Sequence, residues 1–180
     1  MPSLKPLNLQ QWIEAHRDEL RPPVGNKLLY GDGEFLVMAV GGPNARKDFH
    51  VDPAEELFYQ IEGQMTLRVR ESEHIIDVPV APGELLCLPA RVPHSPQRPA
   101  GSVGVVVERR RRAGELDGLQ WYCEHCEAPL YEQFMQLNDI ERQFPPVFAR
   151  FFADPALRTC RRCGSVMQPP TLATSGHGTQ

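Results

Sequence analysis

The chain has 180 residues, of which 41% are hydrophobic, and its formal net charge is -4 at pH 7. This length suits one compact domain with an appendage, and the hydrophobic share is sufficient for a core. The negative balance excludes a general attraction to nucleic acid or to an anionic membrane surface. No stretch approaches the ~18 apolar residues of a membrane span, and MPSLKPLNLQQW contains no apolar signal core. We therefore expect a cytoplasmic protein that binds neither nucleic acid nor membrane.

The first predicted element is a helix over residues 8–20, NLQQWIEAHRDEL. Asn8 is a suitable N-cap, and Trp12, Ile13 and Leu20 follow at helical spacing. The next segment, RPPVGN, is rich in residues that interrupt regular structure, so it is predicted to be a loop.

Residues 27–108 have a different pattern, in which short apolar or alternating runs are separated by glycine, proline or polar clusters. The runs are LLYGDGEFLVMAVGG, ELFYQIEG, QMTLRVRE, HIIDVPV, ELLCLP and GVVVERR. Short strands at close intervals favour an all-β sandwich or barrel over alternating βαβ units. Cys87, inside ELLCLP, is interpreted as a buried small hydrophobic residue.

The composition changes again beyond residues 113–119, where two C-x-x-C pairs stand 33 residues apart. In a chain without a signal peptide, such pairs favour a metal over disulfides, although four unrelated cysteines are the alternative. Four thiolates suit a tetrahedral Zn or a mononuclear, rubredoxin-like Fe. We expect a structural metal that ties down the C-terminal segment, held by Cys123, Cys126, Cys160 and Cys163.

Two histidines and one acidic residue predict a second metal site. His50 precedes Glu56 by six residues, and His94 lies among prolines in LPARVPHSPQRP. Two histidines and one carboxylate on neighbouring strands occupy one face of a metal and leave the opposite face open, as in non-haem Fe(II) oxygenases. The same donors suit Mn, Ni or Zn, so the ligand set alone leaves the metal open.

Glu55 and Glu56 are adjacent, and strand alternation indicates which of them faces the metal. Glu56 shares a face with Phe58 and Gln60, whereas Glu55 lies on the other face. The six-residue step to Gly63 also favours Glu56. We choose Glu56 as the ligand, with Glu55 as the alternative.

The spacing of these residues resembles the paired motifs of the cupin superfamily, whose fold is a double-stranded β-helix barrel. Asp48 stands where the first motif has a further histidine, and Arg91 replaces a glycine of the second motif. Three protein ligands therefore remain where many cupins have four, which leaves room on the metal for a substrate and dioxygen. The positions that match the motifs are Gly42, His50, Glu56 and Gly63 in the first segment and Gly83, Pro89 and His94 in the second, while Arg98 stands where the second motif ends in asparagine.

Longer stretches resemble the 3-hydroxyanthranilate 3,4-dioxygenase family, from about residue 7 to Cys163. They are RPPVGN, VGGPNARKDFHVDPAEELFYQIEG, PGELLCLPARVPHSPQRP, VVERRR and DGLQWYC. The resemblance implies a single Fe(II) held by His50, Glu56 and His94, and a second iron at the four cysteines, as in microbial members. It also implies a homodimer, and substrate contacts from Asn26, Arg46, Glu56, Arg98 and Glu108.

The resemblance further implies how the substrate, 3-hydroxyanthranilate, is held and opened by dioxygen. The phenolate oxygen and the amino nitrogen chelate the iron, while an Arg98 fork binds the carboxylate. Glu108, which faces inward by alternation with Val106, accepts a hydrogen bond from the amino group, and Arg46 stabilises charge on reduced oxygen. The ring then opens between carbons 3 and 4 to give 2-amino-3-carboxymuconate semialdehyde.

We expect residues 1–117 to form the catalytic barrel with its helix, residues 118–166 the metal-binding segment and residues 167–180 a disordered tail. Two other functions remain open. One is another metal-dependent cupin enzyme, either an isomerase or a thiol dioxygenase. The other is a non-enzymatic binding module made by the cysteine pairs and the arginine run 109–112. We interpret that run as mostly the solvated end of a strand, and the net charge of -4 speaks against the module.

Overall fold

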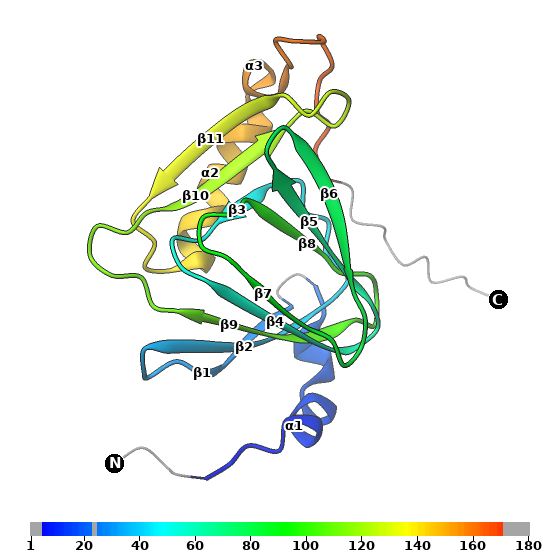
Figure 1. Ribbon diagram of the computed structural model, residues 1–180, viewed down its shortest axis with the longest axis vertical. Helices are drawn as coiled ribbons and strands as arrows, with labels where there is room; N and C mark the ends of the chain where they lie inside the picture. Colours follow the sequence, from blue (N-terminus) through cyan, green and yellow to red (C-terminus); the bar gives the residue numbers. More distant parts are fainter. Residues whose placement is uncertain (1–4, 23–24, 171–180) are drawn as a thin grey trace, which may run out of the picture.

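The computed structural model describes residues 5–22 and 25–170, which form two antiparallel sheets with helices packed at both ends (Figure 1). The five-stranded sheet has the order β1-β2-β9-β4-β7, and the six-stranded sheet the order β11-β10-β3-β8-β5-β6. This architecture confirms the mainly β, cupin-like fold that the sequence predicted. In the part of the chain that is described, no helix has the length and apolar character to cross a membrane.

The strands of the five-stranded sheet are β1 (Asn26–Tyr30), β2 (Phe35–Gly41), β4 (Glu56–Glu62), β7 (Leu85–Leu88) and β9 (Val103–Arg109). Those of the other sheet are β3 (Phe49–Val51), β5 (Met65–Glu71), β6 (His74–Val80), β8 (His94–Gln97), β10 (Asp117–Tyr122) and β11 (Pro129–Met135). All six predicted runs contain strands, and the first run overlaps both β1 and β2. The short β3 and β8 were not among those runs, because three or four residues do not establish an alternating pattern.

The barrel core lies between the inner faces of the two sheets. Phe58 of β4 and Met65 and Leu67 of β5 are almost completely buried, and Met38 of β2 and Val106 of β9 pack with them. Along β4 and β5 every second residue is buried, as the pleat requires. The inner side chains near one end of the barrel are polar, and there the strands carry the candidate site.

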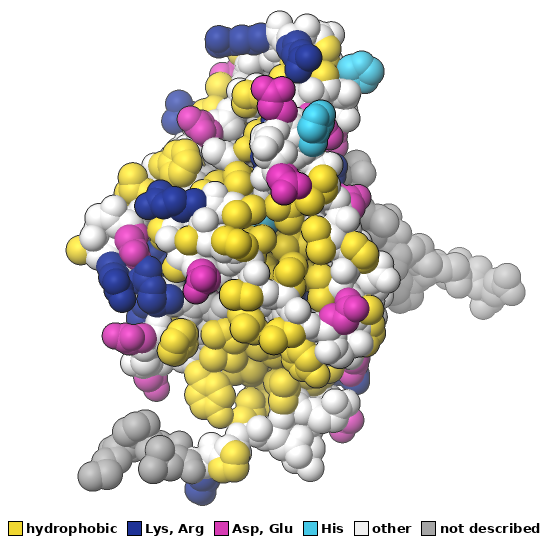
Figure 2. All heavy atoms as spheres, in the orientation of Figure 1, with side chains coloured by type: hydrophobic (Ala, Val, Ile, Leu, Met, Phe, Trp, Pro, Cys, Tyr) yellow, Lys and Arg dark blue, Asp and Glu magenta, His cyan; other side chains and the backbone are white. Residues whose placement is uncertain are grey.

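The outer face of the five-stranded sheet is apolar (Figure 2). The register places Tyr59 beside Leu85 and Leu57 beside Cys87, all pointing away from the core. Phe35 of β2 and Leu85 of β7 are 61% and 63% exposed. The prediction that Cys87 is buried was wrong, because its strand turns this position outward and Cys87 is exposed.

The N-terminal helix is shorter than the predicted 8–20. Helix α1 spans Leu9–Ala15 and a 3-10 turn, η1, spans Arg17–Leu20. The predicted N-cap is confirmed, because the Asn8 side chain accepts a hydrogen bond from Gln11 N at 3.0 Å. Leu20 packs tightly on the barrel next to Gly41, where a β-carbon would lie 2.1 Å from the Leu20 carbonyl oxygen. Ile13 and Leu20 are both buried and pack with Ala39 and Val103 of the barrel.

The C-terminal segment adds a second core to the barrel. Helix α2 (Ile140–Ala153) lies behind β10 and β11, and α3 (Pro155–Arg158) follows it (Figure 1). Trp121 of β10 stacks on Phe151 of α2 with ring centroids 4.4 Å apart. Since β10 pairs with β3, the segment and the barrel share one sheet. The predicted disordered tail lies, from residue 171, outside the described residues.

Candidate active site

Strands β3, β4 and β8 bring His50, Glu56 and His94 together inside the barrel. His50 and His94 are register partners on adjacent strands, and Glu56 opens β4 in the opposite sheet. The candidate donor atoms all lie within 4.8 Å of one another, and none of the three residues is more than 7% exposed. The structure therefore collects the three predicted ligands in one buried cluster.

The pleat of β4 selects between the adjacent glutamates. Glu56 is buried together with Phe58 and Gln60, whereas Glu55 and Tyr59 are exposed. The predicted facing of this strand is confirmed. Only Glu56 contributes to the cluster.

His94 and Glu56 face each other as two ligands of one ion would. His94 Nδ1 lies 3.0 Å from the Val92 carbonyl oxygen, so a proton there is donated to the backbone and the Nε2 lone pair remains free. Nε2 lies 2.8 Å from Glu56 Oε2, yet that oxygen has no hydrogen-bond partner among the described residues. Two donors ~2.1 Å from one ion and at right angles to each other lie ~3.0 Å apart. The residues present fit a bound metal cation.

The charge of the cluster also suits a cation. Burial alone would raise the pKa of Glu56, but the neighbouring His94 outweighs it and lowers that pKa to about 2. Burial lowers the pKa of His94, and the Glu56 carboxylate overcomes this and raises it. Glu56 is therefore an anionic donor at any pH where the fold is expected to be intact.

A cavity of about 760 Å³ lies beside the cluster. Its volume and its mixture of apolar walls with a few convergent polar groups are typical of a small-molecule site. Apolar walls come from β2, β4, β9 and α2. The polar lining contains His50 and all five predicted substrate contacts, Asn26, Arg46, Glu56, Arg98 and Glu108.

Arg98 is a buried cation without a carboxylate partner. Its side chain donates from Nη1 to Gln60 Oε1 at 3.1 Å, and the residue is 3% exposed. No described carboxylate lies within ion-pair distance of its guanidinium. Burial lowers the pKa of Arg98 to about 10, so it remains charged at neutral pH. Gly104 leaves the required space, since a β-carbon there would lie 3.0 Å from Nη1 and 2.8 Å from Gln60 Oε1.

The other polar groups of the cavity are held in different ways. Arg46 forms an ion pair with Asp48. Asp48 is the residue that stands where the cupin motif has a further histidine. Asn26 donates to Met38 Sδ at 3.4 Å. Glu108 faces inward as predicted and is almost completely buried, and its Oε1 has no hydrogen-bond partner among the described residues. That oxygen is therefore available to a donor on a ligand.

Arg111 has a buried side chain beside the cluster, a placement that the sequence did not reveal. The interpretation of residues 109–112 as solvated is wrong for Arg111, whose side chain is 5% exposed and contacts three carboxylates. Arg112, by contrast, is exposed. Strand β9 ends at Arg109, so alternation along the strand does not predict the direction of Arg111.

Helix α2 supplies one wall of the cavity, through Ile140, Phe144 and Phe148. The ring of Phe144 lies 5.6 Å, centroid to centroid, from that of His50. The sequence predicted only metal binding for the segment that contains α2. The spacing of Phe144, Phe148 and Phe151 could have indicated this wall, because it marks an apolar helix face.

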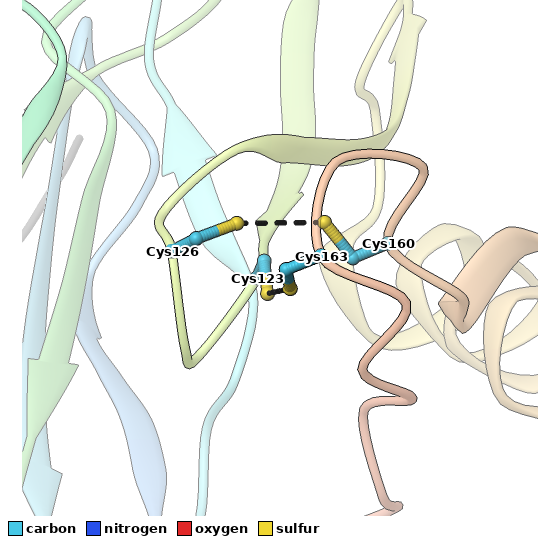
Figure 3. Close-up of side chains that lie close together, drawn as sticks. All are labelled: Cys123, Cys126, Cys160 and Cys163. Carbon is cyan, nitrogen blue, oxygen red and sulfur yellow. Dashed lines mark hydrogen bonds between the residues drawn. The ribbon is translucent and has the colours of Figure 1, made fainter.

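The four predicted cysteines form a separate cluster at the far end of β10 (Figure 3). Cys123 Sγ lies 3.5 Å from Cys163 Sγ, and Cys126 Sγ lies 3.5 Å from Cys160 Sγ. These distances are too long for disulfide bonds of ~2.05 Å. They are close to the ~3.8 Å that separates thiolates bound at ~2.3 Å around a tetrahedral metal. This arrangement fits one metal ion held by four sulfurs.

Two matching turns present the four sulfurs. Glu127 N donates to Cys123 O at 2.9 Å, and Gly164 N donates to Cys160 O at 2.9 Å. Both turns end in the left-handed region, with φ of 57° at Glu127 and 76° at Gly164. Glycine adopts this conformation freely, whereas Glu127 adopts it at a cost.

The chain is similar to known proteins over almost its whole length. The family model described as 3-hydroxyanthranilic acid dioxygenase matches residues 1–152. A 3-hydroxyanthranilate 3,4-dioxygenase of Xanthomonas euvesicatoria pv. vesicatoria is 53% identical over 167 residues, covering 93% of this chain and 94% of that protein. One from Jannaschia sp. is 45% identical over 174 residues, covering 94% and 97%. A solved cupin-2 domain containing protein from Shewanella frigidimarina has 15% identity and a TM-score of 0.45, covering 54% of this chain and 92% of its own. On the family match and the first two relatives, this chain belongs to the 3-hydroxyanthranilic acid dioxygenase family.

Proposed function

We propose that this protein opens the aromatic ring of 3-hydroxyanthranilate with dioxygen, the activity that its family and relatives are named for. The observation that carries this proposal is the pairing of two features in one cavity. A His-Glu-His cluster that fits a cation lies beside Arg98, a buried guanidinium with no described carboxylate partner. Such a cavity suits an aromatic acid that binds a metal and an arginine at the same time.

The proposed catalytic metal is Fe(II), held by His50, Glu56 and His94. When bound, iron supplies redox chemistry toward dioxygen and a template that orients both reactants. The single carboxylate, Glu56, leaves part of the ion's charge uncompensated, which favours an anionic oxygen donor of the substrate. The cluster has three protein donors, so positions remain for substrate and dioxygen.

The side chains around the metal bind and orient the substrate. Arg98 binds the carboxylate with two parallel hydrogen bonds, which fixes which ring bond faces dioxygen. Glu108 accepts a hydrogen bond from the amino group through Oε1, which has no hydrogen-bond partner among the described residues. Asn26 contributes a further polar contact, and Arg46 stabilises negative charge that develops on oxygen.

The apolar walls of the cavity also support the proposed ring cleavage between carbons 3 and 4. Phe144 and Phe148 of α2 cover the cavity opposite Met38 and Val106 and exclude water from the reacting ring. Both oxygen atoms enter the product, 2-amino-3-carboxymuconate semialdehyde. This is a reaction of the kynurenine pathway.

The four-cysteine cluster is proposed to hold a structural Fe or Zn. Four sulfurs fill a tetrahedral coordination shell and leave no position for a substrate. The site requires reduced cysteines, so a cytoplasmic location is part of the proposal.

A homodimer is also proposed, formed through the apolar outer face of the five-stranded sheet. Phe35, Tyr59 and Leu85 are exposed there, and large exposed apolar patches mark association sites (Figure 2). Leu85→Glu should therefore shift the protein from dimer to monomer in analytical ultracentrifugation. Leu28→Glu serves as a control, because Leu28 is exposed but pairs with Met38 and so lies on the other face of the sheet. A Leu85→Glu variant that remains dimeric would place the interface elsewhere.

The activity is tested by loading the protein anaerobically with Fe(II) and then adding 3-hydroxyanthranilate and air. We expect a ring-opened chromophore that is absent with His94→Ala. A chromophore of equal yield from His94→Ala would contradict the proposed metal site. Inactivity of the loaded wild type, with turnover of a thiol or an isomerase substrate instead, would favour a different cupin chemistry.

A further inference from the structure

A buried ion-pair network lies next to His50. Arg111 Nη2 is 2.6 Å from Asp117 Oδ1 and 2.8 Å from Asp52 Oδ2, and Arg111 Nη1 is 2.9 Å from Glu108 Oε1. Asp117 Oδ1 is in turn 2.8 Å from His50 Nε2. One guanidinium thus connects a proposed metal ligand with a proposed substrate contact.

We propose that Asp117 and Arg111 are positioning residues for this site. Asp117 fixes the orientation and the protonated nitrogen of His50, and Arg111 fixes Asp117 and Glu108 together. The inference rests on the metal site described under Proposed function, and it adds two residues that do not touch the metal.

The hydrogen bond between His50 and Asp117 sets which nitrogen of His50 can bind a metal. A neutral imidazole carries one proton, and only the other nitrogen can bind a cation. Asp117 accepts the Nε2 proton, which leaves the Nδ1 lone pair for a metal. Metal-bound histidines commonly donate their second N–H to a carboxylate in this way.

The backbone fixes Asp117 where this hydrogen bond needs it. Asp117 is the first residue of β10, and Gly118 and Leu119 pair with Val51 and His50 of β3. Asp117 has no exposed surface, so water does not compete for its oxygens. The pairing of two strands therefore places the carboxylate beside the imidazole before any metal binds.

Arg111 in turn holds the plane of the Asp117 carboxylate. Arg111 Nε lies 3.0 Å from both Asp117 oxygens, and Nη2 reaches Oδ1 as well. A guanidinium presents several donors in one rigid plane, whereas the lysine ammonium is a single point. Without this cation, the completely buried Asp117 carboxylate would lose its arginine partner, which is strongly unfavourable.

Arg111 also contacts Glu108. Their 2.9 Å contact does not have hydrogen-bond geometry, so it holds the carboxylate by charge and leaves Oε1 available to the substrate. Arg111 therefore acts on the metal side through Asp117 and on the substrate side through Glu108. Changing Asp117 should affect chiefly the metal, whereas changing Arg111 should affect both.

The neighbouring arginines provide a matched control. Arg112 is exposed, and Arg109 forms a partly exposed ion pair with Glu115. Arg112→Gln removes the same charge one residue away from Arg111 but leaves the buried network intact. A general effect of charge on metal binding would appear equally in this control.

The experiment measures Mn(II) affinity in the full-length protein, by following free Mn(II) with electron paramagnetic resonance. Mn(II) prefers nitrogen and oxygen donors to thiolates, so it reports on the barrel site and not on the cysteines. We expect Asp117→Asn to weaken Mn(II) binding by ~10–100-fold, as is usual for carboxylates that orient metal-bound histidines. Arg111→Lys should weaken Mn(II) binding and also raise KM for 3-hydroxyanthranilate, whereas Arg112→Gln should match the wild type.

Folding is followed in the same samples by circular dichroism. A merely structural role predicts a lower melting temperature with unchanged Mn(II) affinity of the folded protein, and that result for Asp117→Asn would overturn the inference. If Asp117→Asn does not fold, Arg111→Lys decides in the same assay, and wild-type affinity there would also overturn it. If wild type and His94→Ala bind Mn(II) equally poorly, the proposed metal site itself fails and the positioning role fails with it.

Discussion

The two candidate metal sites of this molecule are assembled in different ways. In the barrel, His50 and His94 meet because β3 and β8 pair, and Glu56 comes from the opposite sheet. The four cysteines instead come from two short turns, each of which supplies a C-x-x-C pair with its own hydrogen bonds. The first site depends on correct closure of the barrel, whereas half of the second is already defined by local sequence.

The surroundings of the two sites differ as well. The barrel donors are buried beside a cavity that holds a buried guanidinium and several carboxylates. At the cysteine cluster, Cys160 is buried but Cys163 is exposed, and four sulfurs complete a tetrahedron. An incomplete set of metal donors next to a cavity suits catalysis. A complete set of donors at the periphery suits a structural metal site.

The largest expected effect comes from breaking the barrel site. Glu56→Ala removes the only carboxylate among the three proposed ligands and should abolish iron retention and ring opening. Glu55→Ala is the control, because its side chain is exposed on the other face of the strand. Iron content and chromophore formation measure both variants, and loss of iron from Glu55→Ala alone would show that the wrong glutamate was chosen.

Removing Arg98, the proposed partner of the substrate carboxylate, should have the next largest effect. Arg98→Ala removes two charge-assisted hydrogen bonds to the substrate carboxylate, worth ~3 kcal/mol together, so kcat/KM should fall by ~100-fold or more. Arg98→Lys keeps the charge without the fork and should recover only part of the loss. Mn(II) affinity should be unchanged in both, and an unchanged kcat/KM in Arg98→Ala would assign the carboxylate to another residue.

The sequence predicted the parts of the barrel that depend on spacing and alternation. The fold follows from strand runs with a period of two, and the inward facing of Glu56 and Glu108 follows from the same period. His50 and His94 were identified through motif spacing, although the strands that carry them were too short to predict. Motif spacing therefore located the proposed ligands where secondary-structure patterns were weak.

The residues that escaped prediction lie where the chain is irregular or where distant segments meet. Arg111 follows the end of β9, so its inward direction depends on a loop and on contacts with Glu108, Asp117 and the distant Asp52. Phe144 reaches the cavity only because α2 packs across β10. Cys87 was predicted from the apolar character of its strand, but both faces of β7 are apolar and only tertiary structure decides which is buried.

The separation of the two sites is tested by Cys160→Ser. This change should lower bound metal by about one atom per chain, because a serine hydroxyl is a poor replacement for a thiolate donor to Zn or Fe. Ring opening should persist, since the barrel ligands are untouched. Cys87→Ser is the control outside the cluster and should retain all metal. Metal analysis that shows no change in Cys160→Ser would refute the four-sulfur site.

The smallest effect concerns the conformation of the first cysteine turn. Glu127 holds a left-handed φ of 57° at the position equivalent to Gly164, which costs a non-glycine residue ~1 kcal/mol. Glu127→Gly should relieve that strain and raise the melting temperature of the metal-loaded protein by ~2–4 °C. Glu127→Ala keeps the strain but removes the carboxylate contacts to Ile75 N and His74, so it should give no gain. Equal melting temperatures for the two variants would mean that the turn is not strained, and the two cysteine turns would then be energetically alike.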